Sequence, residues 1–204
     1  MTRGRGRRST LLLSFVVLAA LAMVVALPSG TAVKAAEVKT WTGNGANDNW
    51  STADNWSPVG APVAGDSLVF GPGGTRLTNV NDLAAGTSFE SLAFGGASWV
   101  ISGNAIQLVS GLELTDGTAD IALNVGGAGG VVVDGGNVTL TGTNTFTGDV
   151  QVIDGRLFVG SSGALGTTGG VTLLPGGTPG VVDGVTPAEP VAAEDSNTDI
   201  SSEG

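Results

Sequence analysis

The chain has 204 residues, of which 35 are glycine and only 13% are charged. This size and composition favour a single all-β domain, because helix-favouring runs are almost absent after position 30. The chain contains no cysteine, histidine or tyrosine, which excludes disulfides, thiolate chemistry, the usual zinc sites and histidine-dependent nucleophiles.

Residues 1–35 have the pattern of a signal peptide. Four arginines precede an apolar run at 11–27, and a small-residue cleavage site ends at Ala35. The alternative is a retained membrane anchor, for which 17 residues is short. Removal of this segment leaves three basic against 18 acidic residues, a formal charge of 3 − 18 = −15. We therefore expect no nucleic-acid partner, and no membrane span after cleavage.

Residues 36–76 are expected to form an N-terminal cap or leader: a short strand at 38–42 leads into an asparagine-rich loop at 43–55. Three tryptophans, Trp41, Trp50 and Trp56, form an aromatic cluster here. We favour a cap in which they cover the first coil of the structure that follows. The alternative is a glycan platform, in which exposed indoles stack on sugar rings and the amides of Asn49 and Asn55 bind hydroxyls. The loop lacks the spacing of a known calcium site, and we expect no metal.

Residues 77–174 contain short segments with apolar side chains at every second position, closed by glycine turns every six to eight residues. Strands this short need neighbours to cover them, which predicts a short right-handed parallel β-helix (a β-solenoid) of about five coils of roughly 20 residues. A β-sandwich is the alternative. The expected inward pairs include Leu92/Phe94, Trp99/Ile101, Ile106/Leu108, Leu112/Leu114, Ile121/Leu123/Val125, Val131/Val133, Val138/Leu140, Val150/Val152, Leu157/Val159 and Val171/Leu173.

Two further positions have expected roles at a coil corner. The amide of Asn144 should satisfy backbone groups there, and Phe146 should point inward to fill the corner. Residues 175–204 combine prolines, glycines and acids without an alternating strand. This composition predicts a disordered acidic tail.

A family resemblance rests on the string GNVTLTGTNTFTGDVQVIDGRLFVGSSGALG, residues 136–166. It resembles the autotransporter-associated β-strand repeat, also called the passenger-associated transport repeat. Residues 41–108 are similar to the leader that often precedes such repeats. The resemblance implies an exported β-solenoid that belongs to a surface-displayed stalk or passenger.

Catalysis would have to use carboxylates, as in polysaccharide lyases and hydrolases. The preferred interpretation is turn chemistry, because three of the candidate acids stand in Asp-Gly pairs, where the acid caps a turn and glycine takes a positive φ. The candidates are Asp116, Asp120, Asp134, Asp149 and Asp154, with Arg156 as the nearby cation.

The sequence thus predicts an exported, non-enzymatic β-solenoid module that is secreted or displayed at the cell surface, where it has a structural or adhesive role. We expect no catalytic residues and no cofactor. Surface glycans or other cell-surface proteins are the expected partners. The alternatives are a carbohydrate-binding module that uses the three tryptophans of the cap and, less favoured, a polysaccharide lyase or hydrolase.

Overall fold

The structure, a computed structural model, describes residues 35–167, 171–174, 176–181 and 191–193. The predicted signal peptide, apart from Ala35, lies outside them. Within the described part of the chain, no helix is long and apolar enough to cross a bilayer. The elements are β1 (Val38–Trp41), the 3-10 helix η1 (Ala53–Asn55), β2 (Trp56–Ser57), β3 (Ser67–Phe70), β4 (Thr78–Asn81), β5 (Thr87–Phe94), β6 (Ser98–Gly103), β7 (Ile106–Leu114), β8 (Thr118–Ile121), β9 (Val125–Gly127), β10 (Gly130–Leu140), β11 (Thr145–Phe146), β12 (Val150–Val159), β13 (Val171–Leu173), β14 (Gly177–Val181) and β15 (Val191–Ala193).

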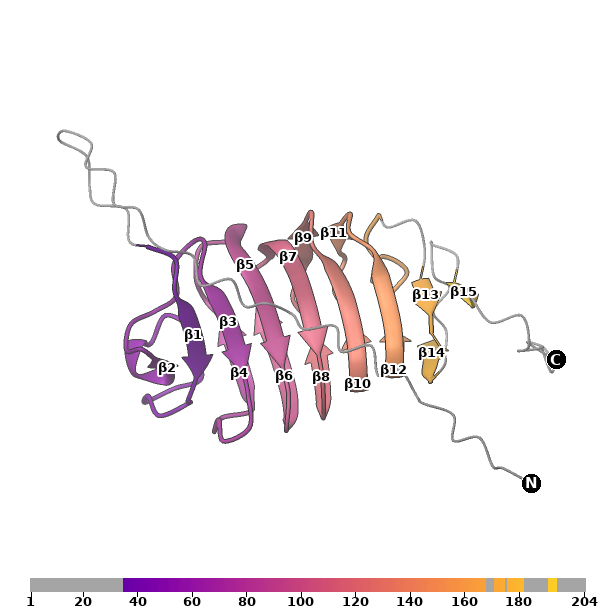
Figure 1. Ribbon diagram of the computed structural model, residues 1–204. Helices are drawn as coiled ribbons and strands as arrows, with labels where there is room; N and C mark the ends of the chain where they lie inside the picture. The colour runs from indigo at the N-terminus through magenta and orange to yellow at the C-terminus, as the bar shows by residue number, and fades with distance from the viewer. Residues whose placement is uncertain (1–34, 168–170, 175, 182–190, 194–204) are drawn as a thin grey trace, which may run out of the picture. The chain divides into compact units, whose positions relative to one another are not determined.

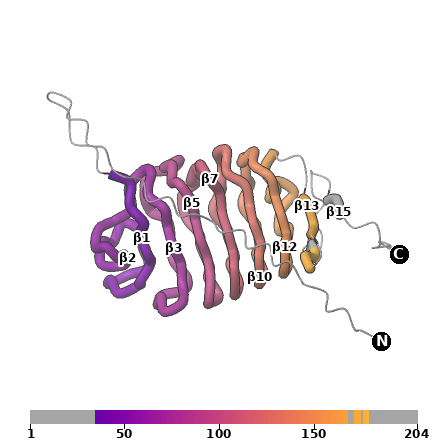
Figure 2. The backbone as a smooth tube through the Cα atoms, in the orientation of Figure 1, coloured from indigo at the N-terminus to yellow at the C-terminus, as the bar shows by residue number. Residues whose placement is uncertain are grey.

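The strands form three parallel ladders, and the chain visits each ladder once per coil (Figures 1 and 2). Ladder 1 passes through residues 38–40, 67–70, 91–94, 111–114, 130–133, 150–152, 171–173 and 191–193. Ladder 2 passes through residues 78–81, 98–103, 118–121, 137–140, 156–159 and 178–181. Ladder 3 passes through residues 87–89, 106–108, 125–127 and 145–146. Among the described strand pairs only β1–β2 is antiparallel. The prediction of an all-β parallel solenoid of about five turns is confirmed, and the β-sandwich alternative is wrong.

The interior is built from apolar side chains that stack in register from coil to coil. In ladder 1, Leu92 pairs with Leu112, Leu112 with Val131, and Val131 with Val150. These partners are 20, 19 and 19 residues apart, which is the length of one coil. Every inward pair predicted from the sequence is buried. The alternation of the sequence therefore places one face of each strand in a continuous core.

The corner between ladders 1 and 2 is built on stacked glycines. Gly117, Gly136 and Gly155 occupy it on successive coils with φ angles of 83°, 71° and 99°. A Cβ at Gly155 would overlap the carbonyl oxygen of Gly136, and a Cβ at Gly136 would overlap that of Gly117. Positive φ and close backbone approach both require glycine at this corner.

The ladders extend beyond the segment that the sequence assigns to the solenoid. Ladder 1 reaches back to β1 and β3, so residues 36–76 share a sheet with the coils that follow. At the other end, β14 pairs with β12 and β15 with β13, inside the segment 175–204 that we expected to be disordered. That expectation is corrected for these two strands, because the outer edges of β12 and β13 present backbone groups with which a following extended segment can pair. The other tail residues lie outside those described, apart from Gly176.

Candidate functional site

The three tryptophans of the cap (residues 36–76) form one buried aromatic cluster. Trp41, Trp50 and Trp56 are 1%, 0% and 1% exposed. The ring of Trp56 lies edge-on to the rings of Trp41 and Trp50, at centroid distances of 5.1 Å and 5.9 Å. Phe70 of β3 packs against all three indoles and stacks on Phe94 of the next coil at 5.0 Å. The aromatic cluster therefore continues the core of the coils.

The polar edges of the three indoles are also satisfied inside the protein. The Nε1–H of Trp41 donates to the carbonyl of Thr75 at 2.8 Å, and that of Trp56 to the carbonyl of Trp50 at 2.8 Å. Trp50 donates to Oδ1 of the buried Asn79 at 2.6 Å. No indole face or N–H is left to meet a sugar. The alternative of an exposed glycan platform on these three tryptophans is corrected, because their rings are buried against the first coil, as the favoured cap interpretation expects.

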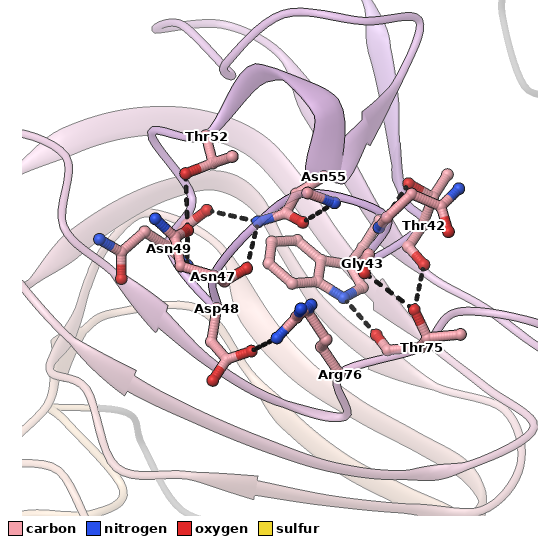
Figure 3. A network of polar contacts seen from close by, with 12 residues as sticks. Thr42, Gly43, Asn47, Asp48, Asn49, Thr52, Asn55, Thr75 and Arg76 are labelled. Atoms are coloured by element: carbon pink, nitrogen blue, oxygen red, sulfur yellow. Dashed lines mark hydrogen bonds and ion pairs between the residues drawn. The ribbon is translucent and has the colours of Figure 1, made fainter.

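The asparagine-rich loop is held together by Asn55, which lies at the end of η1 and is 0% exposed (Figure 3). Its Nδ2 donates to the carbonyls of Asn47 and Asn49, both at 2.9 Å. Its Oδ1 accepts the N–H of Gly45 at 2.8 Å. The Asn55 amide is thus saturated by the loop backbone and cannot bind a ligand hydroxyl. Asn49 lies half-buried, and its backbone pairs with Val80.

A second set of contacts ties this loop to the segment that follows β3 (Figure 3). The hydroxyl of Thr75 lies 2.9 Å from the carbonyl oxygens of Thr42 and Gly43 and donates to them. Arg76 forms an ion pair with Asp48 at 3.0 Å. Within the described residues, no group of three acidic, histidine or cysteine side chains could hold a metal ion. The polar groups of the loop are bonded within the cap itself, which is the arrangement of a structural element.

Two charged side chains of the cap have buried roles that the sequence analysis missed. Lys39 is 1% exposed, stands in register with Leu68, and contacts the carbonyl of Pro58 and the carboxylate of Glu37, both at 3.0 Å. Asp66 is 0% exposed and accepts the N–H groups of Glu37 and Val63 at 2.8 Å and 2.9 Å. The signal for Lys39 was present, since it shares the inward parity of Trp41 on one strand.

The carboxylates considered for catalysis all lie exposed. Asp134 and Asp154 are register partners at the glycine corner, and Asp116 precedes the glycine of that corner one coil earlier. Each is followed by a glycine with positive φ, as the turn interpretation predicts. Within the described residues, none of them forms a hydrogen bond or ion pair with Arg156. The arrangement is an exposed row of acids rather than an enclosed pair.

The corner after ladder 2 matches the prediction made from the sequence. Asn144 is 4% exposed, and its Nδ2 donates to the carbonyl of Ala164 on the next coil at 2.6 Å. Its Oδ1 accepts the N–H of Val125 on the preceding coil at 2.8 Å. Phe146 is 1% exposed and points into the core. One amide therefore bridges three successive coils.

Comparison with known proteins gives one informative similarity. The chain is 30% identical over 144 residues to the adhesin BmaC autotransporter of Brucella suis biovar 1 (strain 1330). The aligned part is 65% of this chain but 4% of that protein, so the chain corresponds to a small piece of its relative. No family model and no solved structure matches the chain. Over most of its length, this β-solenoid is similar to an autotransporter adhesin.

Proposed function

We propose that this protein is an exported, non-enzymatic β-solenoid module with a structural or adhesive role at or outside the cell surface. The observation that carries the proposal is the similarity to an autotransporter adhesin across 65% of a chain that folds as a parallel solenoid. The signal-like pattern of residues 1–35 supports export. A non-enzymatic role fits a chain in which three of the five candidate acids precede turn glycines and whose sequence contains no histidine or cysteine.

The finer family assignment, to the autotransporter-associated β-strand repeat, belongs to the same proposal. Its motif, residues 136–166, spans about one and a half coils, from the second half of β10 to the turn after β12. The alternating pieces of the motif correspond to ladder strands, its asparagine to the bridging amide of Asn144, and its aromatic position to the buried Phe146. These positions give a physical reason for the strands, the asparagine and the aromatic residue of the motif.

Fractionation of cells that produce the full chain tests the proposal. We expect an antibody to detect the protein in the medium, wall or outer surface, with a mass that lacks residues 1–35. The matched control is Leu18→Arg, which places a charge in the apolar run and should leave the chain in the cytoplasm. Wild-type protein retained in the cytoplasm would overturn the export proposal.

Attachment of the same cells to host-cell or glycan-coated surfaces separates the two roles. An adhesive module predicts that wild-type cells attach more strongly than Leu18→Arg cells. If wild-type cells display the protein at the surface but attach no better than Leu18→Arg cells, the adhesive role is contradicted and the structural role remains.

A further inference from the structure

The outward face of ladder 2 carries a compact set of polar and aromatic side chains on β8, β10 and β12, which lie side by side (Figure 1). The register places them in two adjacent rows, each of which crosses three coils. We call this set the ladder-2 face. The first row is Thr118, Asn137 and Arg156, and the second is Asp120, Thr139 and Phe158.

Phe158 is the one aromatic side chain of the described residues that lies outside the buried core. It alternates with Leu157 and Val159, which are 1% and 3% exposed, so it must point away from the interior. Its register neighbours are Thr139 and Gly180. Phe158 is half-buried rather than buried, so part of its ring remains open to solvent on the outward face.

Arg156 is equally unused by the fold. The other two basic residues of the described chain, Lys39 and Arg76, are held in ion pairs. Arg156 is exposed and forms no ion pair or hydrogen bond within the described residues. Asn137 stands beside it on β10. A guanidinium without a partner among the described residues, next to an amide and two positions from a half-buried aromatic ring on the same face, can form a binding surface.

The spacing of the face fits a small ring. Adjacent coils lie about 4.8 Å apart, and same-side residues two apart along a strand lie about 6.7 Å apart. Three coils and two rows therefore cover about 10 Å by 7 Å, which is the size of one or two sugar rings. The intervening inward residues are fully buried, among them Ala119, Val138 and Leu157. The backbone beneath the face is therefore fixed, so that little ordering is required when a ligand binds.

We propose that the ladder-2 face binds a neutral oligosaccharide. The ring of Phe158 offers a platform for sugar C–H groups, Arg156 donates to hydroxyl oxygens, Asp120 accepts from hydroxyls, and Asn137 can do both. A neutral ligand is favoured over an anionic one because Asp120, Asp134 and Asp154 lie exposed on the same three strands as Arg156, the one cation there, in a strongly acidic chain. The proposal names a ligand class for the adhesive role, and its biological meaning rests on that proposed function.

Binding of the purified full chain to immobilised oligosaccharides tests this proposal. The probes are neutral oligomers of glucose, galactose, mannose and N-acetylglucosamine, with sialylated and uronate oligosaccharides for comparison. Because a flat face gives weak monovalent binding, the chain is presented on beads to gain avidity. We expect at least one neutral probe to bind. Phe158→Thr and Arg156→Gln should each weaken that binding by about tenfold.

Ser98→Ala is the matched control, because Ser98 lies in the same row as Arg156, three coils earlier, and is exposed. It should leave binding unchanged. All variants should keep the wild-type urea midpoint, since each position faces outward. The proposal is overturned by a chain that binds none of the neutral probes, that binds only the anionic ones, or that binds equally well after Phe158→Thr. None of these results depends on where the cell places the protein. Failure of the binding proposal can therefore be distinguished from failure of the export proposal, which the fractionation experiment tests.

Discussion

The cap (residues 36–76) and the coils (residues 77–174) bury apolar surface in different ways. The coils repeat one solution, in which aliphatic side chains stack on their register partners every 19 to 21 residues. The cap contains contacts that occur once: two indoles packed edge-on against a third, an amide saturated by its own loop, and a buried lysine that donates to the Pro58 carbonyl. A coil inside the solenoid is covered by the coils on either side of it. The first coil has no preceding coil, so side chains of the cap must cover it instead.

Truncating one of the three cap tryptophans should have the largest effect on stability. Trp50→Ala removes a fully buried indole and leaves Asn79 without its partner. We expect the free energy of unfolding to fall by about 4 kcal/mol, measured from urea unfolding followed by circular dichroism. Val59→Ala is the control, because Val59 is 71% exposed and its truncation should cost almost nothing. Equal midpoints for Trp50→Ala and wild type would contradict the sealing role of the cluster.

The equivalence of coils can be tested at two register partners. Leu92→Ala and Leu112→Ala remove side chains that stack on each other and are 0% and 2% exposed. Each should cost about 3 kcal/mol, and the two costs should agree within about 1 kcal/mol. Gln151→Ala, at an outward position of the same ladder, should be near neutral. A large difference between the two leucines would show that the coils are not interchangeable.

The bridging amide should matter less than a core side chain. Asn144→Ala leaves the buried N–H of Val125 and the carbonyl of Ala164 without a partner, so we expect a loss of about 2 kcal/mol. The matched control is Asn124→Ala, because Asn124 bonds the N–H of Thr143 at an exposed position where water can replace it. A control variant that is as unstable as Asn144→Ala would argue against the importance of burial.

The smallest effect is expected at the ion pair of the cap. Arg76 pairs with Asp48 on the surface and has a positive φ of 52°. Arg76→Ala should cost less than about 1 kcal/mol, and the loss should shrink at high salt. Arg76→Gly relieves the left-handed backbone, worth about 1 kcal/mol, and should be at least as stable as Arg76→Ala. Urea midpoints at low and high salt measure both effects, and a more stable alanine variant would contradict the strain argument.

The comparison also explains which features could be predicted from the sequence. The inward rows, the corner amide and the Asp-Gly turns were predictable, because the same pattern recurs in successive coils. Alternation along each strand is enough to decide which side chains point inward. The burial of the tryptophans was ambiguous, because a cap and a sugar platform use the same residue types. The roles of Lys39 and Asp66 depend on long-range partners, Pro58 and Glu37 among them, whose proximity no local pattern encodes.

The tail shows a different limit. Composition favoured disorder for 175–204, yet β14 pairs with β12 in a parallel ladder, and the hydroxyl of Thr178 also donates to the carbonyl of Gly155. Strand pairing at an open edge depends on the neighbour already in place rather than on the composition of the added strand. Amino-acid composition is therefore a weak predictor of disorder for a segment that follows an existing strand ladder.

Quenching of intrinsic fluorescence by acrylamide tests the sealed interior most directly. The chain has four tryptophans and no tyrosine, and all four indoles, Trp41, Trp50, Trp56 and Trp99, are at most 1% exposed. We predict blue-shifted emission that acrylamide barely quenches in the folded protein and quenches fully in urea. Emission at the wavelength of a solvated indole, with ready quenching of the native protein, would contradict a solenoid closed by an aromatic cap.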